Sequence, residues 1–518
     1  MLKETYYRPP TELDGLIFEK LVPAEHYLRK VKTLINFERY RDTLASCYSP
    51  DEGRPADDPV LMVKLEFLQF QYNLSDRQVI AHTQVNVAFR YLLDLSIEST
   101  LPDPSLLSVF RRRVGPQRHE DLLQALVGQA REAGLVKDRL RLKDATHVIA
   151  NIAIPSTLRL VAETRDQLLQ AAQPLAPVRV AEAHAHAAVL RQATADLSDE
   201  ARLLQRVNHL REIVAWADTL PADAAQWARV APPVQQTFIA ALALAHHVLA
   251  DRESPEAGDK VVSVHDPAAR LGKHGAYYHG YLFDLTMDAE SELITAVNVL
   301  PANGDETADA QVLITQEESA QGNDVQALSI DGIGFRGKRL REWQDPQGLN
   351  LEVFVPPTPL PEPTGYFTPH DFATEDEGEC VRCPAEQATT RRYRTSNDSG
   401  WQYQFTRATC AACPRLARCM ARLPQHNGRV VVKNDYQVEY AAARQKAQTA
   451  EYAKVRQQHP AIERKLAELV RVHRMRWARY RKQGYVRIQA LLTAFVVNIK
   501  RMVGLSASAR LQLAPGGA

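Results

Sequence analysis

The sequence has almost no net charge, no long apolar segment and few cysteines. Its 63 Lys and Arg balance 62 Asp and Glu, so a surface for nucleic acid must be a local patch. We find no apolar run near the roughly 18 to 20 residues that span a bilayer, and MLKETYYRPP at the N-terminus lacks the apolar stretch of a signal peptide. These absences predict a soluble, cytoplasmic protein with no membrane partner.

The length and the hydrophobic content indicate several folding units. At 518 residues the chain exceeds one ordinary domain, and 45% hydrophobic residues supply more than one core. The pattern along the chain predicts an α+β multidomain protein with three or four units. Residues 1–135 read as a helical domain, 136–155 and 259–370 as two parts of one α/β core, and 156–258 as a helical insertion. Residues 371–435 form a cysteine-rich insert, and 436–518 a second helical segment.

The first 135 residues predict short, capped helices. A helix is expected to begin at Asp58-Pro59, and Ser75 is suited to cap the next one. A later helix ends in Arg111, Arg112 and Arg113. Short capped helices with a basic final element resemble a helix-turn-helix array, although many all-α domains share this pattern. We therefore predict DNA binding through these three arginines.

Two short strands that each end in an aspartate predict a catalytic site. One is residues 140–144, ending at Asp144, and the other is residues 327–331, ending at Asp331. Strands at 277–285, 293–300 and 351–355 and a helix at 309–320 complete a pattern typical of a ribonuclease-H-like α/β core, interrupted after its first strand. The histidines of the helical insertion read as solvated or interface residues: His184, His186, His246 and His247.

Five of the six cysteines lie within forty residues and indicate a zinc site. They are Cys380, Cys383, Cys410, Cys413 and Cys419. In a reducing cytosol such a cluster favours metal over disulfides, and two Cys-x2-Cys pairs have the spacing of a zinc ribbon or knuckle. Four of these five thiols would hold a structural Zn²⁺. Buried thiols without metal are the alternative interpretation.

The C-terminal segment carries a concentration of positive charge with interleaved aromatics. Residues 464–501 contain a single acid, Glu468, apart from which the charged side chains are Lys and Arg. Aromatic interleaving favours a surface that follows phosphates over a merely solvated face. The predicted DNA contacts in this segment are Arg474, Arg476, Arg479, Arg481 and Lys482.

Four stretches of the chain resemble bacterial insertion-sequence DDE transposases that have an InsH-like N-terminal domain and a cysteine-rich insert. They are residues 48–60 with 74–77, Lys143-Asp144-Ala145-Thr146, residues 266–303, and Ile462-Glu463-Arg464 with a later basic helix ending at Asn498. The sequence departs from the family at Ala145, where Gly is usual, and at Val470, where Lys is usual. The resemblance favours Cys383, Cys410, Cys413 and Cys419 as the zinc ligands.

The resemblance implies that Asp144, Asp331 and Glu463 hold two Mg²⁺ or Mn²⁺ ions. Such ions need hard oxygen ligands on rigid elements, and they activate the nucleophile and stabilise the leaving oxygen. Glu468 is the alternative third ligand, and Asp266 is a further carboxylate in a matched motif. The partners implied are double-stranded DNA, at the element ends and target, and further copies of the chain, as a homodimer or higher oligomer on DNA in the nucleoid.

The sequence therefore predicts an enzyme that binds the ends of an insertion sequence and cuts and transfers DNA strands. Two other functions compete with this hypothesis. One is a catalytically inactive, transposase-derived DNA-binding protein. The other is a metal-dependent nuclease of the same fold. The presence of all three acids favours the active transposase.

Overall fold

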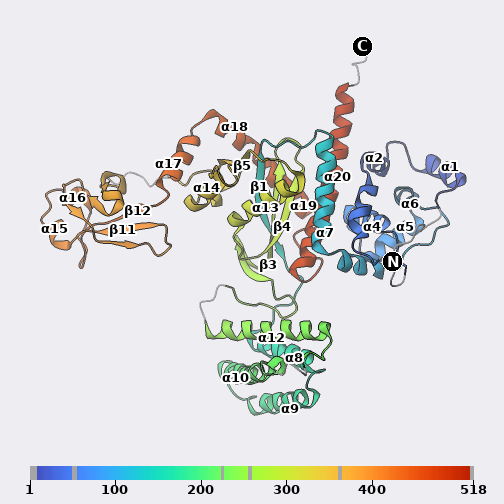
Figure 1. The fold of residues 1–518 in the computed structure, drawn as a ribbon, viewed down its shortest axis with the longest axis horizontal. Helices are drawn as coiled ribbons and strands as arrows, with labels where there is room; N and C mark the ends of the chain where they lie inside the picture. The colour runs from blue at the N-terminus through green and yellow to red at the C-terminus, as the bar shows by residue number, and fades with distance from the viewer. Residues whose placement is uncertain (1–8, 50–54, 223–226, 255–258, 360–364, 514–518) are drawn as a thin grey trace.

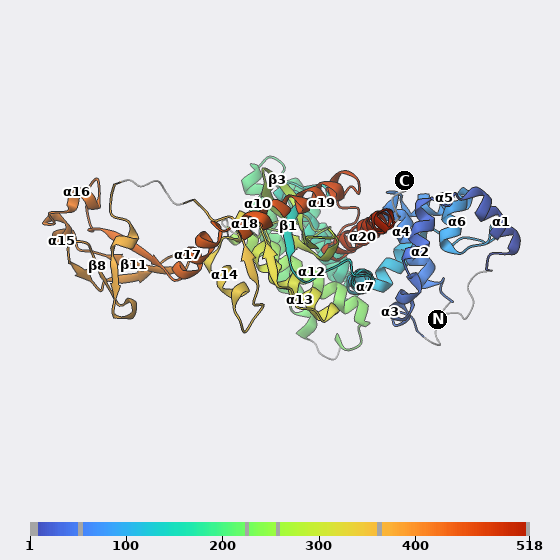
Figure 2. The same ribbon diagram turned by 90° about the horizontal axis from the view of Figure 1, so that it is seen from above.

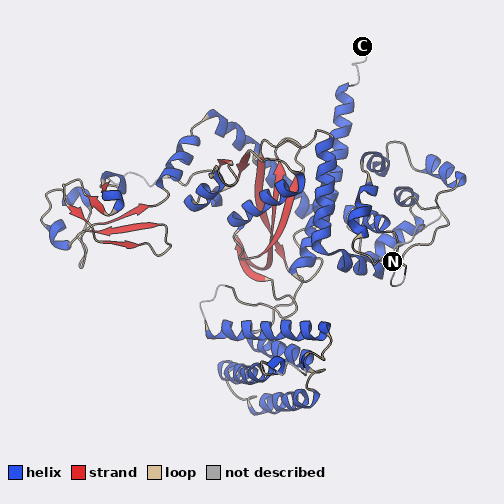
Figure 3. Ribbon diagram, viewed as in Figure 1, coloured by secondary structure: helices blue, strands red, loops and turns tan. Residues whose placement is uncertain are grey.

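A computed structural model describes residues 9–49, 55–222, 227–254, 259–359 and 365–513 and shows a mixed helical and sheet protein. A central sheet lies between three lobes (Figures 1 and 3). The N-terminal helices lie on one side and the cysteine-rich lobe on the other, at opposite ends of the long axis, and a helical bundle projects from one end of the sheet (Figures 1 and 2).

The N-terminal lobe consists of short capped helices and one long helix. Asp58 caps α4, and Ser75 caps α5 with a capping box to Gln78, so both predicted helix starts are confirmed. The long helix, α7, is broken at Gly115, whose φ of 70° leaves the helical region ahead of Pro116. The helices are α1 (Glu12–Leu21), α2 (Tyr27–Leu34), α3 (Arg41–Ala45), α4 (Pro59–Gln71), α5 (Asp76–Val85), α6 (Val87–Leu93) and α7 (Ser105–Glu132).

The central sheet has the order β4, β3, β1, β5, β6, with β2 also pairing β3. Strand β3 is antiparallel to β1, β2 and β4, whereas β1, β5 and β6 are mutually parallel. The strands are β1 (Arg141–Ile149), β2 (Arg270–His274), β3 (Ala276–Asp288), β4 (Ile294–Pro301), β5 (Ala327–Ser329) and β6 (Glu352–Phe354). The prediction that the first strand ends at Asp144 is wrong, because its hydrogen bonding to β3 continues through Ile149.

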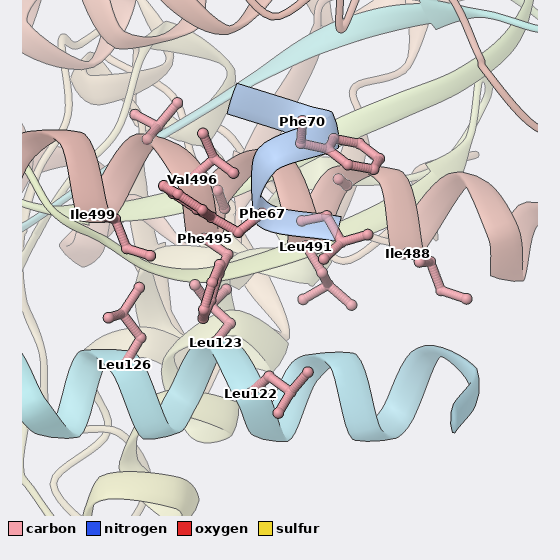
Figure 4. Close-up of a cluster of buried hydrophobic side chains, with 14 of the residues drawn as sticks. Phe67, Phe70, Leu122, Leu123, Leu126, Ile488, Leu491, Phe495, Val496 and Ile499 are labelled. Carbon is pink, nitrogen blue, oxygen red and sulfur yellow. The ribbon is translucent and has the colours of Figure 1, made fainter. Parts of the chain in front are cut away.

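Two helical layers cover the sheet. Helix α13 (Glu306–Gln321) packs on β3 and β4, while α19 (Pro460–Arg471) packs on β1, and α20 (Gln483–Leu513) packs on α7, α4 and β4. Figure 4 shows Phe67 of α4 and Leu122, Leu123 and Leu126 of α7 meeting Phe495 of α20. The N- and C-terminal parts of the chain therefore share one hydrophobic core.

Helix α20 corrects two predictions. Its residues Gln483–Ser506 are long and apolar enough to cross a membrane by length and composition, although no such run was expected. Because 78% of its most apolar window is buried inside the protein, we interpret it as a core helix. It is also not the basic helix predicted for this region, since the predicted DNA contacts lie in the loop that precedes it.

Residues 157–253 form a helical bundle with its own core. Its helices are α8 (Thr157–Ala172), α9 (Pro177–Ala193), α10 (Asp199–Ala217) and α12 (Pro232–Glu253). Leu168, Leu210 and Phe238 are fully buried between them. The bundle follows β1 in the chain and returns to the sheet through β2, so it projects from the sheet edge in Figure 1.

The cysteine-rich lobe contains two small sheets, β7 to β9 and β10 to β12. Strands β7 (Ala373–Glu375), β8 (Cys380–Arg382) and β9 (Ala388–Thr389) form the first, and β10 (Arg392–Arg394), β11 (Gly400–Gln404) and β12 (Val430–Asn434) the second. Two short helices, α15 (Arg407–Ala411) and α16 (Leu416–Cys419), lie at its tip. Helices α17 (Gln437–Lys446) and α18 (Ala450–Gln458) lead the chain back to the sheet.

We predict that Phe495→Ala destabilises the shared core. Phe495 is 2% exposed and packs edge-on against Tyr40, so its removal leaves a cavity. The expected loss is about 3 to 5 kcal/mol in the free energy of unfolding, measured by denaturant titration. The matched control is Val85→Ala, whose side chain is 81% exposed and whose loss should be near zero. Equal effects of the two substitutions would contradict this packing.

Candidate active site

The central strand β1 carries buried charges on the face that meets α13. The Arg141 guanidinium is 2.6 Å from Glu317 of α13 and 3.0 Å from Asp288 of β3. The Lys143 ammonium is 3.1 Å from Asp284 and 3.5 Å from Glu306. Side chains alternate along a strand, so Leu142 and Asp144 point to the opposite face, where Leu142 joins the core that includes α19.

Asp144 is held in a partly desolvated position beside a second carboxylate. Burial raises the pKa of Asp144 to about 6, and the negative charge of Asp331 adds to the rise. A hydrogen bond of 2.8 Å from the Ala145 N–H to Asp144 Oδ1 acts in the other direction. Burial and the neighbouring negative charge therefore make the Asp144 carboxylate costly to ionise.

Asp331 follows β5 at the level of Asp144. Leu142 pairs with Ser329 in the parallel β1–β5 ladder, so two further residues bring Asp144 and Asp331 side by side. The Asp331 carboxylate is exposed, and it also caps a short turn by accepting a 3.2 Å hydrogen bond from the Ile333 N–H. Capping fixes its position and leaves the second carboxylate oxygen open to solvent or a ligand.

Glu463 lies on α19, and the start of this helix is attached to the end of β5. Two side chains on the approach to α19 fasten it to the end of β5: the Arg456 guanidinium donates to Ser329 Oγ (3.1 Å) and to the Ile330 carbonyl (2.9 Å), and His459 Nδ1 lies 3.1 Å from Ser329 Oγ. Asp331 and Glu463 both attract the Arg456 guanidinium, which opposes the lowering of its pKa by burial.

Arg456 and His459 were not among the predicted site residues. Both precede Glu463 at helical spacing, by seven and four residues, which is the signal that could have placed them on one face with it. Burial and the neighbouring Arg456 lower the pKa of His459 to about 4, so its ring is neutral at physiological pH. A neutral imidazole serves here as a hydrogen-bonding anchor for the helix.

The competing carboxylates are occupied elsewhere. Glu468 is 2.6 Å from Lys500 and 3.3 Å from Lys465, so its charge is already balanced. Asp266 is fully buried and accepts a hydrogen bond from the Tyr281 hydroxyl, which gives it a structural role. Both are therefore weaker candidates than Glu463 for a third acid.

The predicted zinc ligands divide into a group of four and one outlier. Cys383, Cys410, Cys413 and Cys419 line one small cavity, whereas Cys380 is buried in β8 and does not line it. The Arg429 backbone N–H donates to Cys410 Sγ at 3.3 Å. Within the described part of the chain, no three His, Cys, Asp or Glu side chains are arranged closely enough to hold a metal, and this includes the acids and the thiols.

Comparison with known proteins identifies the family. Residues 16–113 match a transposase domain (DUF772), and residues 382–503 match a transposase DDE domain. These two matches support an insertion-sequence DDE transposase. The DDE match contains Glu463 and four of the clustered cysteines, and it excludes Asp144, Asp331 and Cys380.

One curated protein resembles part of the transposase. It is "Uncharacterized protein ORF8 in nfe locus" from Rhizobium meliloti, 28% identical over 175 residues, which is 32% of this chain and 84% of that protein. No solved structure is significantly similar to the chain. The assignment of individual site residues therefore depends on the geometry described above.

The predicted arginine contacts of the N-terminal lobe need a correction. Arg111 is 3% exposed, pairs with Asp76 and lies over the Tyr480 ring, so it holds the lobe to the C-terminal segment and cannot contact DNA. Arg112 and Arg113 are exposed on α7, and Arg113 stacks on Tyr48. The transposase domain thus presents two of the three arginines to solvent.

The predicted basic residues near the C-terminus also divide by exposure. They lie in a loop, residues 472–482, which hydrogen-bonds to Ile149 at the end of β1. Arg476 donates to the His147 carbonyl (2.7 Å) and Arg479 to the Leu74 carbonyl (3.1 Å), so both are partly buried structural groups. Arg474, Arg481 and Lys482 are exposed and can meet a phosphate.

We predict that Asp144→Asn stabilises the transposase at neutral pH. Because the folded pKa of Asp144, about 6, exceeds its usual 3.8, the wild type loses stability as pH rises between these values. The neutral amide avoids that loss, so unfolding at pH 7.5 should cost about 1 to 3 kcal/mol more in the variant, and the gain should vanish near pH 4. Thermal unfolding at both pH values, with exposed Asp324→Asn as the control, measures this. A gain independent of pH would contradict it.

Proposed function

We propose that this transposase binds the ends of an insertion sequence and catalyses divalent-metal-dependent DNA cleavage and strand transfer on a ribonuclease-H-like core. The sheet supports this proposal: β3 runs antiparallel to β1 and β4, the later strands β5 and β6 run parallel to β1, and β1 is central. The observation that carries it is the pairing of Asp144 on β1 with Asp331 after β5, which lie close enough for the charge of Asp331 to raise the pKa of Asp144.

The residues present fit a divalent cation. Two carboxylates, Asp144 and Asp331, are close enough to raise the pKa of Asp144, and one of them is half-buried, so a cation would relieve both repulsion and desolvation. Mg²⁺ or Mn²⁺ held by these residues and Glu463 would supply activation of the nucleophile and stabilisation of the leaving oxygen.

The protein's own residues position the reactants. Ionised Asp144 and Asp331 would orient a cation or a water molecule between them. The contacts of Ser329 Oγ with Arg456 and His459 fix the start of α19 relative to β5. Arg456 holds a positive charge beside Asp331 and Glu463, where an incoming phosphate would also lie. The helical lobe and the loop 472–482 offer exposed cations for the DNA backbone, namely Arg112, Arg113, Arg474, Arg481 and Lys482.

A structural zinc in the cysteine-rich lobe is part of the proposal. Four thiols around one cavity are the donor set of a closed tetrahedral site, and the Arg429 N–H donates to Cys410 Sγ at 3.3 Å. Such a site leaves no open coordination position, so its role would be to tie the tip helices α15 and α16 to Cys383, which follows β8 of the β7–β9 sheet.

Neutralising any one of the three acids should remove strand cleavage. Asp144→Asn, Asp331→Asn and Glu463→Gln are each expected to lower the cleavage of a labelled element end in Mg²⁺ by several orders of magnitude, because each removes an anionic ligand. End binding, measured by mobility shift, should persist. The matched control is Glu468→Gln, on the same helix and ion-paired to lysines, which should still cleave.

The outcomes separate the alternatives. Wild type that binds ends without cutting would indicate an inactive DNA-binding derivative, and cutting without joining to a second DNA would indicate a nuclease. If Glu468→Gln loses cleavage and Glu463→Gln keeps it, the third acid is misassigned. Normal cleavage by both aspartate variants would overturn the transposase mechanism.

We predict one zinc per chain, lost with the thiols of the cavity. Elemental analysis of protein purified without added metal should give a ratio near one for wild type and for Cys380→Ser, whose thiol lies outside the cavity. The Cys410→Ser, Cys413→Ser double variant should contain none and should melt at lower temperature, because metal binding contributes to folding. Zinc retained in the double variant, or lost in Cys380→Ser, would refute this ligand set.

A further inference from the structure

The helical bundle contains a hollow lined by arginines from three different helices. Arg159 and Arg165 come from α8, Arg191 from α9 and Arg206 from α10, around a volume of ≈ 310 Å³. The remaining lining residues are Ala162, Glu163, Asp166, Ala187, Leu190 and Thr194. We name this hollow the arginine cleft.

The positive charge of the arginine cleft exceeds its internal compensation. Glu163 is 2.6 Å from Arg159, and Asp166 is 2.6 Å from Arg165, so two of the four cations are paired. Arg191 and Arg206 form no ion pair with any described residue. Arg206 donates instead to the Leu158 carbonyl (2.8 Å), and three neighbouring arginines together with burial lower its pKa.

An arginine face on a helix is most often simply solvated. Here guanidinium groups from three helices line one concavity, where their positive charges repel one another. An anion bound in the arginine cleft would offset this repulsion. Planar guanidinium groups bind phosphate oxygens in a fork, which makes a phosphate the fitting anion.

The position of the bundle favours DNA as the source of that phosphate. Arg159 lies in the first turn of α8, which begins eight residues after β1, the strand that carries Asp144. Arg481 donates to the Asn151 carbonyl at 3.0 Å, in the segment that connects β1 to α8. The exposed cations of the loop 472–482 therefore lie beside the start of the bundle. The bundle projects from the end of the sheet at which this loop pairs with Ile149 (Figure 1).

We propose that the arginine cleft binds the phosphodiester backbone of duplex DNA engaged by the transposase. Arg191 and Arg206 are the principal contacts, and Arg159 and Arg165 add charge at the rim. The inference extends the proposed function, since it assigns the bundle a role in holding DNA away from the chemistry. Phosphate contacts of this kind add affinity without reading sequence.

The test measures binding of the full chain to labelled duplex DNA by fluorescence anisotropy at several salt concentrations. Arg191→Ala combined with Arg206→Gln removes the two unpaired cations and keeps the polar volume at position 206. The matched control is Arg179→Ala, an exposed arginine on α9 already paired with Glu182. Loss of two phosphate contacts should weaken binding about tenfold and lower the slope of log K against log salt by about 2, while the control stays at wild type.

The remaining arms keep the outcomes distinct. Melting curves of the double variant should match wild type, and a chemically different pair, Arg191→Lys with Arg206→Lys, should restore most binding if charge is what matters. Wild-type affinity and salt slope in the double variant would overturn the proposal. So would loss of inorganic tripolyphosphate binding with duplex binding intact, because the cleft would then hold a free anion. Failure of the proposed function would give a different result, because the wild-type protein would then neither bind nor cut DNA.

Discussion

The register of β1 is the constraint on which the site depends. Arg141 and Lys143 point toward α13 and are fully buried against carboxylates, and Asp144 is the next residue and points the other way. A slip of one residue would place Asp144 among Asp284 and Glu306 and would expel two buried cations from their partners. Breaking a buried ion pair costs roughly 3 to 5 kcal/mol. The charged face toward α13 therefore fixes which face of the sheet carries Asp144, the proposed catalytic acid.

The third acid depends on a different attachment. Glu463 is distant in sequence from Asp144 and Asp331, because the whole cysteine-rich lobe lies between β6 and α19. The position of Glu463 therefore depends on how α19 is attached to the sheet. Ser329, at the end of β5, receives both Arg456 and His459, so the residue two places before Asp331 anchors the helix that presents Glu463. The Ser329 hydroxyl thus links the segment before Asp331 to the start of the helix that carries Glu463.

Much of this could be predicted from sequence because local chemistry decides it. The caps at Asp58 and Ser75, the β character of 277–300 and the helical bundle all follow from short-range patterns, and family order pointed to Asp144, Asp331 and Glu463. The burial of individual arginine side chains could not be predicted from local sequence patterns. Arg111, Arg476 and Arg479 are basic residues in basic segments, yet tertiary contacts with Asp76, the His147 carbonyl and the Leu74 carbonyl make them structural. The extent of β1 and the apolar core role of α20 also depend on partners distant in sequence.

The architecture separates chemistry from attachment. The helical bundle is inserted just after β1, the strand that carries Asp144. The cysteine-rich lobe is inserted between β6 and α19, the helix that carries Glu463. Neither contributes an acid, so each is free to carry cations or thiols without disturbing the carboxylates. The acids themselves are costly to the fold, because Asp144 is partly desolvated next to a like charge. A site that is unfavourable when empty and favourable with a cation gains affinity for that cation from the relief of its own repulsion. The buried network on the far side of β1 is what allows the protein to retain such a site and remain folded.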